Sequence, residues 1–160
     1  MDFKNSLAVG LEAAKKARSN KEEIFSVISD LNDSVKELSQ GRVFLKVTSE
    51  KKLAPNQTAL TAVVSSFTNI NPYIDYEALS FVTKREQTEV KENIAVWKIN
   101  ESDGYPCVIS YNKRDVSCKD KETLIKALND LMSDASTGEI LLRLMNTEVI
   151  LPSNSGHAAK

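Results

Sequence analysis

The sequence predicts an α+β domain with N-terminal amphipathic helices, an antiparallel meander sheet of about five or six strands, and C-terminal helices on one sheet face. Apolar residues recur at the helical period in the first and last quarters of the chain, and they alternate with period two between those quarters. With 160 residues, the chain is long enough for one domain to bury its own core. We therefore expect a single domain over residues 1–152, with a helical segment over 1–40, the sheet over 42–119 and helices over 120–146, followed by a disordered tail at 153–160.

The N-terminal segment carries a seven-residue apolar repeat. Apolar or small side chains recur at alternating steps of four and three, first at Phe3, Leu7, Gly10, Ala14 and Ala17, and then at Ile24, Ile28, Leu31, Val35 and Leu38. Ser19 and Asn20 each precede a glutamate by three residues, which is the signature of a helix start. We therefore favour two helices, over about 2–18 and 20–39. One long helix is the alternative, because the repeat keeps its register through Lys21.

The second group of the repeat is the main candidate for an interaction surface. Its members are Ile24, Ile28, Leu31, Val35 and Leu38. They occupy close to two positions per heptad, whereas a helix that packs only on its own sheet usually shows about three. We predict that this stripe packs partly on a second subunit or a partner protein. The alternative is that it packs wholly within its own domain.

The middle of the chain changes to the strand period. Strands are expected over residues 43–48, 58–67, 77–84 and 94–99. A short helix starting at Pro72 competes with the beginning of the third strand. The charged residues 85–92 are expected to form a turn or a protruding hairpin tip, and residues 100–104 have the composition of a turn.

The last hairpin allows a prediction of register. If Asn112 and Lys113 form its two-residue loop, strands 105–111 and 114–118 place Cys107 opposite Cys118, Ile109 opposite Val116 and Tyr111 opposite Arg114. Those six residues share one face, which we expect to be the buried face. The two cysteines are then neighbouring buried thiols, and a disulfide or a redox switch is the alternative.

The chain is expected to return to helix after the sheet. Asp120 is a suitable N-cap, and an apolar face follows at Leu124, Ile125, Leu128, Leu131 and Met132. Residues 134–138 interrupt this pattern. A short second helix over about 140–145 has few polar positions, so we expect it to be largely buried.

Several chemistries are disfavoured by the residues that the sequence lacks. Its one histidine, His157, lies in the expected tail, where nothing holds it against a nucleophile. The five glycines form no phosphate-binding loop, and two cysteines do not supply a structural zinc site. We predict no catalytic residue, no cofactor and no metal site. A small enzyme that uses carboxylates without histidine is the remaining enzymatic alternative.

The charge balance does not indicate a polyanionic partner. There are 21 basic and 22 acidic residues, which gives a formal net charge of −1. The basic cluster Lys15, Lys16, Arg18 and Lys21 supplies candidate phosphate contacts, so a nucleic-acid-associated accessory protein is a second alternative. No apolar run approaches the length of a membrane span, and no signal peptide is recognisable, so we expect a cytoplasmic protein that does not bind membranes.

These observations together favour a non-enzymatic protein-interaction module of the adaptor, inhibitor or chaperone-like kind. Its partner is expected to be another protein or a second copy of itself, contacted through the N-terminal helices. Because a fold does not by itself specify a function, this expectation depends on which apolar surfaces the fold leaves uncovered.

Overall fold

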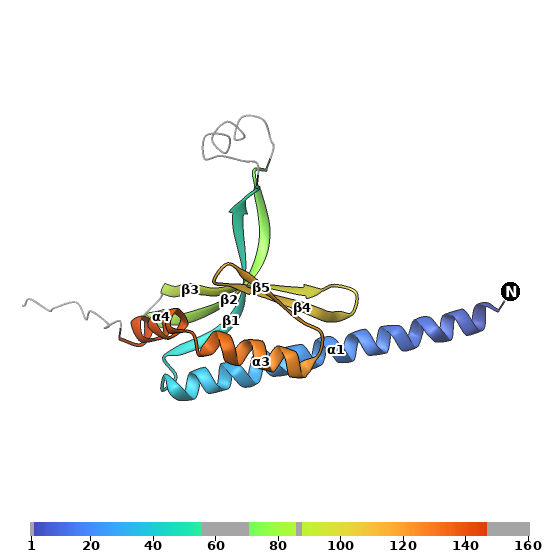
Figure 1. Ribbon diagram of the computed structural model, residues 1–160, viewed down its shortest axis with the longest axis horizontal. Coiled ribbons are helices and arrows are strands. Elements are labelled where there is room, and N and C mark those ends of the chain that lie inside the picture. Colours follow the sequence, from blue (N-terminus) through green and yellow to red (C-terminus); the bar gives the residue numbers. More distant parts are fainter. Residues whose placement is uncertain (1, 56–70, 86–87, 147–160) are drawn as a thin grey trace, which may run out of the picture.

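The computed structural model describes residues 2–55, 71–85 and 88–146. Its elements, in chain order, are the helix α1 (Phe3–Leu38), the strands β1 (Val43–Leu53), β2 (Tyr73–Arg85), β3 (Thr88–Asn100), β4 (Gly104–Tyr111) and β5 (Arg114–Cys118), and the helices α3 (Lys121–Met132) and α4 (Ala135–Asn146). The strands form one antiparallel sheet in the order β1-β2-β3-β4-β5. This is the predicted α+β meander with C-terminal helices on the sheet (Figure 1).

The N-terminal segment is one helix rather than the two that we favoured. α1 runs without a break through residues 18–20, and the polar groups that suggested a new helix start have other partners. The side chain of Asn20 donates to the carbonyl oxygen of Asp103, and Glu22 accepts from Arg18 one turn earlier. Because the apolar repeat keeps its register through Lys21, a continuous helix satisfies both groups of the repeat.

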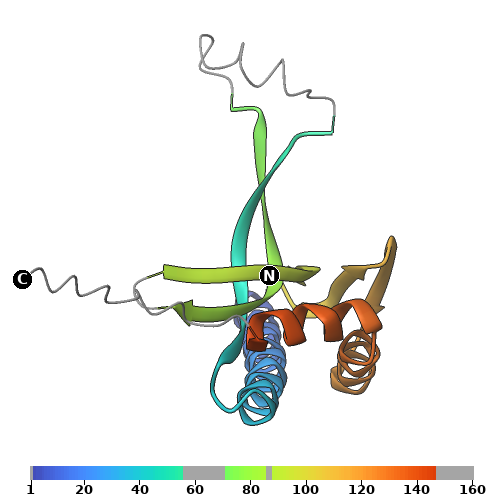
Figure 2. The same ribbon diagram turned by 90° about the vertical axis from the view of Figure 1, so that its left-hand side faces the viewer.

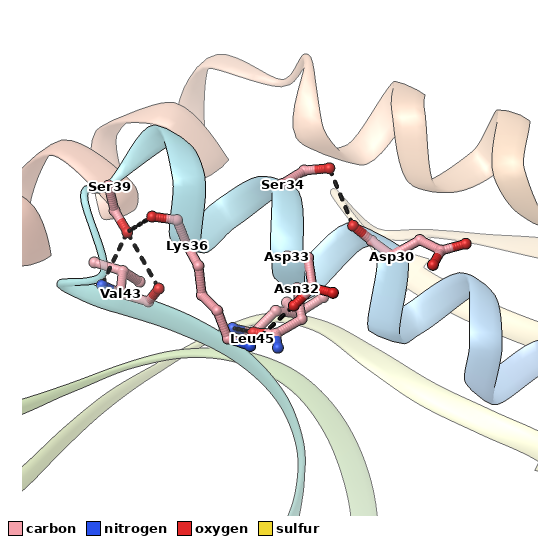
Figure 3. Close-up of polar contacts among 8 residues, drawn as sticks. All are labelled: Asp30, Asn32, Asp33, Ser34, Lys36, Ser39, Val43 and Leu45. Carbon is pink, nitrogen blue, oxygen red and sulfur yellow. Dashed lines mark hydrogen bonds and ion pairs between the residues drawn. The ribbon is translucent and has the colours of Figure 1, made fainter.

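α1 ends where side-chain and backbone groups satisfy its last carbonyls. The amide of Gly41, at a φ of 76°, donates to the carbonyl oxygen of Lys36. The Ser39 hydroxyl donates to the carbonyl oxygen of Val43 and accepts from the amide of the same residue, so the helix end is tied to the start of β1 (Figure 3). Two turns earlier, the side-chain oxygen of Asn32 accepts from the amide of Leu45. These contacts cover the first part of the outer edge of β1, which is an edge strand.

The sheet buries one face against the helices. α1, α3 and α4 lie on the same side of it (Figure 2). Side chains from neighbouring strands form the centre of the core on that face, as the register pairs Leu45 with Phe81 and Trp97 with Ile109. All four are almost fully buried, and residues of α1 and α3 complete the same cluster.

The sheet divides into two parts at the middle of β2. β2 pairs with β1 along the whole of both strands, from Val43 opposite Thr83 to Leu53 opposite Tyr73. Its pairing with β3, however, stops at Glu77 opposite Trp97. Beyond that point, residues 50–53 of β1 and 73–76 of β2 form a two-stranded projection, which we call the arm (Figure 1).

The strand predictions are confirmed in part. The strands at 43–48, 77–84 and 94–99 are present and longer than expected. The alternative helix from Pro72 is wrong, because Tyr73 already pairs with Leu53 of β1. The predicted hairpin tip at 85–92 lies between β2 and β3: Arg85 is opposite Thr88, and the strand pairing continues to Phe81 opposite Glu92, so residues 88–92 are already strand. The predicted strand at 58–67 lies outside the described residues.

The last hairpin has the predicted register. Cys107 is opposite Cys118, Ile109 is opposite Val116 and Tyr111 is opposite Arg114. Both cysteines, Ile109 and Tyr111 are buried, whereas Val116 is only partly buried and Arg114, which directly follows the two-residue loop, is exposed. Asn112 and Lys113 have positive φ angles of 50° and 61°, as a two-residue hairpin loop requires.

The two C-terminal helices are present, but α4 begins at Ala135, about five residues before its predicted start, so most of the predicted interruption at 134–138 is helical. Asp120 caps α3 by accepting from the amide of Thr123, as expected. α4 is less buried than we predicted: within it only Thr137 and Leu144 are buried, and Leu142 is exposed. An amphipathic helix against the rim of a sheet needs only one covered stripe, and its outward apolar positions remain in water. The predicted tail at 153–160, with His157, lies outside the described residues.

Candidate functional site

The stripe predicted to be an interaction surface belongs mainly to the core of its own domain. Ile24, Ile28 and Val35 are buried against the sheet and α3, and Leu31 is partly buried against the same cluster. Leu38, the last member, is 68% exposed at the helix end. Four of the five side chains are therefore already covered by this chain.

The uncovered apolar surface of α1 lies instead on the first group of the repeat. Residues 3–17 project past the edge of the sheet (Figure 1), and we call them the helical extension. The side chains of residues 2–16 are all exposed. Phe3, Leu7 and Leu11 are exposed by 70%, 68% and 63%. Spaced four residues apart, they lie along one side of the helix.

The same side of the helical extension carries small residues toward the sheet. Gly10, Ala14 and Ala17 continue the seven-residue repeat after Leu7. A Cβ atom added at Gly10 would have no other heavy atom within 4 Å, so nothing in the described chain approaches this point. A backbone of another helix can approach such a surface more closely than one lined with leucine.

The helical extension begins where α1 leaves the β3–β4 turn. The side-chain amide of Asn20 donates to the carbonyl oxygen of Asp103 at 2.9 Å, and the Lys21 ammonium donates to the carbonyl oxygen of Glu101 at 2.5 Å. The Tyr105 hydroxyl donates to a carboxylate oxygen of Glu23 at 3.0 Å. Burial and the Glu23 carboxylate together raise the pKa of Tyr105, so this hydroxyl remains a donor at neutral pH.

A polar cleft of about 490 Å³ lies beside these contacts. Its lining includes Lys16 and Lys119 on one hand, and Glu23, Asp103 and Asp120 on the other. Asp120 caps α3 by accepting from the amide of Thr123, which lowers the pKa of its carboxyl, and Glu23 accepts from the Tyr105 hydroxyl. The cleft therefore carries both basic and acidic side chains, and two of its three carboxylates, those of Glu23 and Asp120, already accept hydrogen bonds within the fold.

The four candidate phosphate contacts do not form one basic face. Lys15 pairs with Glu12 at 2.7 Å, and Arg18 pairs with Glu22 at 2.9 Å. Lys21 donates to the carbonyl oxygen of Glu101, while Lys16 is among the residues that line the polar cleft. Neighbouring helical positions are rotated by about 100°, so Lys15 and Lys16 face different directions. The structure distributes these cations around the helix and pairs two of them with acids.

A second cleft, of about 1040 Å³, lies in the angle between the arm and the sheet, and we call it the arm groove. Phe25 of α1, Ile74 of the arm and Val96 of β3 contribute exposed apolar side chains to its lining. Trp97, which is 1% exposed, also contributes to it. The indole Nε1 of Trp97 has no hydrogen-bond partner among the described residues.

The carboxylates that could have served an enzyme are dispersed. Glu92 is bound by Arg143, which lowers the pKa of that carboxyl, and Glu89 pairs with Lys46 at 3.0 Å. Asp75 and Glu77 lie in the wall of the arm groove. Within residues 2–55, 71–85 and 88–146, no three histidine, cysteine or acidic side chains come together as metal ligands.

The two thiols behave as small apolar side chains. Cys107 and Cys118 are fully buried and not bonded to each other. Burial raises the pKa of the Cys107 thiol to about 12, and it raises the pKa of the Cys118 thiol as well. A thiol with a raised pKa forms little thiolate at neutral pH and is a poor nucleophile.

Comparison of the chain with protein-family models, with curated proteins and with solved structures finds no match. No helix in the described part of the chain has the length and hydropathy that crossing a membrane requires. Any function proposed for this protein therefore rests on the geometry of the chain itself.

The arm groove was not predicted from the sequence, and the free apolar stripe was predicted on the second half of the repeat instead of the first. The available signal was the contrast in side-chain size between the two groups. Large branched residues such as Ile24 and Ile28 fill a core, whereas a helix rich in alanine and glycine contributes little to one. That contrast indicates which half lies over the sheet.

Proposed function

We propose that this protein is a non-enzymatic interaction module that pairs with a second copy of itself through the helical extension. The observation that carries the proposal is the row of Phe3, Leu7 and Leu11, each more than 60% exposed on a helix that projects from the domain. Large apolar side chains aligned on one helix side are typical of an interaction surface.

Helix energetics support a partner for this surface. A helical segment of about 15 residues is marginal in water unless its apolar side packs on something. The helical extension is continuous with a packed helix, so its formation needs no separate nucleation. Its outer turns nevertheless gain no tertiary contact from the described chain, and pairing with another helix would supply one.

A second copy fits this surface because the sequence of the helical extension is self-complementary. In an antiparallel pair centred on Gly10, Phe3 of one copy is level with Ala17 of the other, and Leu7 is level with Ala13 and next to Ala14. Large side chains then meet small ones along the seam, as close packing requires. Such a pairing has a twofold axis, so both copies use the same residues.

Side chains that lie beside the seam also affect this pairing. In the same register, Leu11 of the two copies meet beside the axis and add apolar contact. Lys4 lies near Arg18 of the second copy, which places like charges at each end of the seam. The pairing is therefore expected to be driven by apolar contact and opposed by electrostatics at low ionic strength.

A pair of matched substitutions tests the proposal. Leu7→Asp places a charge in the seam, and Leu142→Asp places one on an apolar residue of similar exposure on α4. We expect sedimentation velocity to show a dimer for the wild type and for Leu142→Asp, and a monomer for Leu7→Asp. Circular dichroism should show all three proteins folded, because both leucines are exposed in the single chain.

Two results would count against the proposal. One is a wild-type protein that sediments as a monomer throughout the micromolar range. The other is a Leu7→Asp variant that dimerises as well as the wild type does. A dimer that Leu38→Asp dissociates while Leu7→Asp does not would move the interface to the other end of α1, where Leu38 is the exposed member of the second group.

A further inference from the structure

We propose that the arm groove binds an extended segment of a partner protein, which pairs with the free backbone edge of β2 and carries basic side chains on one face and apolar side chains on the other. This site is separate from the helical extension, and it goes beyond self-association. It would make the protein a receptor for a linear peptide segment.

The first support is an unpaired strand edge. Residues 73–76 of β2 pair with β1 on one side, but their pairing with β3 has ended at Glu77 opposite Trp97. After Trp97, β3 pairs with β4 on its far side, as Lys98 opposite Val108 shows. In the described residues, the inner edge of the arm therefore has no strand partner. Such an edge offers backbone donors and acceptors to an added strand.

The second support is the contrast with the outer edge of β1. There, the side chain of Asn32 occupies the amide of Leu45, and Ser39 occupies the amide of Val43 (Figure 3). Natural sheets commonly cover or block an edge in this way. On the inner edge of the arm, the side-chain oxygen of Asn71 accepts from the amide of Tyr73 at 3.1 Å, so the outer end of that edge is capped. The amide of Asp75, the next one that points away from β1, has no side-chain partner among the described residues, and a cleft of about 1040 Å³ lies against it.

The third support is the apolar lining on the open face of the sheet. Ile74 is 40% exposed and Val96 is 36% exposed, and both line the groove. Tyr76 stands between Ile74 and the sheet on the same face, with the Lys52 ammonium 5.3 Å from the centre of its ring. Alternate residues of an added strand would place apolar side chains against this lining.

The fourth support is the charge on the helix-facing side of the groove. Asp75 and Glu77 project to the opposite face of β2 from Ile74 and Tyr76, because strand side chains alternate. Both carboxylates are exposed, and neither takes part in an ion pair in the described chain. Lys21 of α1, which also lines the groove, is held by the carbonyl oxygen of Glu101, and Lys51 of β1 is opposite Asp75 without forming an ion pair with it in the described chain. An incoming strand with basic residues on this face would complement the two carboxylates.

A synthetic probe can test the pairing directly. The probe is a labelled, acetylated peptide of about ten residues that alternates lysine and valine, which is within ordinary strand length. With the full chain we expect saturable binding by fluorescence anisotropy. We also expect slower amide hydrogen exchange at Asp75 in the complex, because this amide points away from β1 towards the groove, whereas the amides of residues 74 and 76 already face β1.

Substitutions in the two walls should weaken binding separately. Ile74→Asp on the apolar side and Asp75→Lys on the acidic side should each raise the Kd about tenfold or more. Ile125→Asp, on an α3 residue with the same 40% exposure outside the groove, should leave the Kd unchanged. A peptide with glutamate in place of lysine, and one methylated on alternate backbone nitrogens, should both bind at least about tenfold more weakly.

The proposal would be overturned by an absence of saturable binding, or by binding that both wall variants retain in full. It would also be overturned if the wild type alone protected the Asp75 amide more strongly as its concentration rose, since the occupant would then be a second copy. Leu7→Asp should bind the peptide normally, so failure of the self-association proposal and failure of this one are distinguishable.

Discussion

The side-chain amide of Asn20 donates to the carbonyl oxygen of Asp103 at 2.9 Å, and this is the first hydrogen bond from the N-terminus that joins α1 to another described element. It marks the boundary between two halves of one helix. After Asn20, the repeat supplies core residues such as Ile24. Before it, the same repeat faces outward, and we propose that it meets a second copy.

Buried and exposed members of the second group of the repeat should respond differently to truncation of their apolar side chains. Ile24→Ala removes a fully buried side chain, so we expect it to lower the free energy of unfolding by about 2–5 kcal/mol. Leu38→Ala trims an exposed side chain, so its effect should stay within about 0.5 kcal/mol. Urea denaturation at one protein concentration measures both. Equal effects would mean that the core boundary along α1 is misplaced.

Substitutions of Gly10, which lies at the proposed axis, distinguish the effect of helix propensity from the effect of helix packing. Gly10→Ala should make the helical extension more stable, because alanine is favoured over glycine by about 1 kcal/mol within a helix. Gly10→Leu also improves propensity, and it meets no atom within the single chain. Across a close seam, however, two leucines at the axis would force the helices apart. We therefore expect sedimentation to show a dimer for Gly10→Ala and a weakened dimer for Gly10→Leu.

A Gly10→Leu variant that dimerised more tightly than the wild type would contradict the close seam. It would indicate that added apolar area strengthens a looser contact. Circular dichroism of both variants serves as the control, because each should have at least the helix content of the wild type.

Ionic strength should act in opposite directions on the two proposed interactions. Residues 2–18 contain four basic and two acidic side chains, and the antiparallel register places Lys4 near Arg18 of the second copy. Added salt screens this repulsion, so dimerisation should strengthen between about 20 and 500 mM salt. Peptide binding in the arm groove uses opposite charges at Asp75 and Glu77, so it should weaken over the same range. Sedimentation and fluorescence anisotropy measure the two effects, and a common direction would refute one of the charge assignments.

The buried thiols predict the response of the fold to alkaline pH. In the unfolded chain a thiol has a pKa near about 8.5, whereas burial raises the pKa of Cys107 to about 12 in the folded state. The unfolded state therefore loses its proton first, and the free energy of unfolding falls as the pH rises from about 9 towards 12. Cys107→Ala should make that fall less steep. Tyr105, whose pKa is also raised, contributes equally to both proteins.

Thiol labelling of the native protein checks the same burial at neutral pH. Labelling of Cys107 and Cys118 should be slow and should be limited by opening of the hairpin, because both side chains are fully buried. Rapid labelling, or an alkaline slope that Cys107→Ala leaves unchanged, would show that the pair is accessible.

Local patterns predicted the parts of the fold that depend on neighbouring residues. The hairpin register that pairs Cys107 with Cys118 follows from a two-residue loop, and the Asp120 cap follows from its place before an amphipathic run. The break between two N-terminal helices was wrong because the side chain of Asn20 bonds to Asp103, a residue 83 positions away. Local capping signals carry no information about such a partner.

The candidate surfaces were less predictable, because each depends on where an element ends relative to another. The repeat indicated that α1 packs with something, but only the length of the sheet decides that Ile24 is covered and Leu7 is not. The arm groove exists because β2 begins at Tyr73, whereas its pairing with β3 begins only at Glu77. The point at which β2 and β3 separate depends on strand pairing across the whole sheet, which local sequence patterns do not specify.

A cysteine placed at the proposed twofold axis tests self-pairing most directly. In the antiparallel register Gly10 of one copy meets Gly10 of the other, so Gly10→Cys brings two thiols within the reach of a disulfide. Phe3→Cys is the matched control, because in this register the two Phe3 positions are about 20 Å apart along the axis. Under mild oxidation we expect Gly10→Cys to form a covalent dimer on a non-reducing gel and Phe3→Cys to remain a single chain. A Gly10→Cys protein that stays monomeric, or a Phe3→Cys protein that cross-links as readily, would contradict the account.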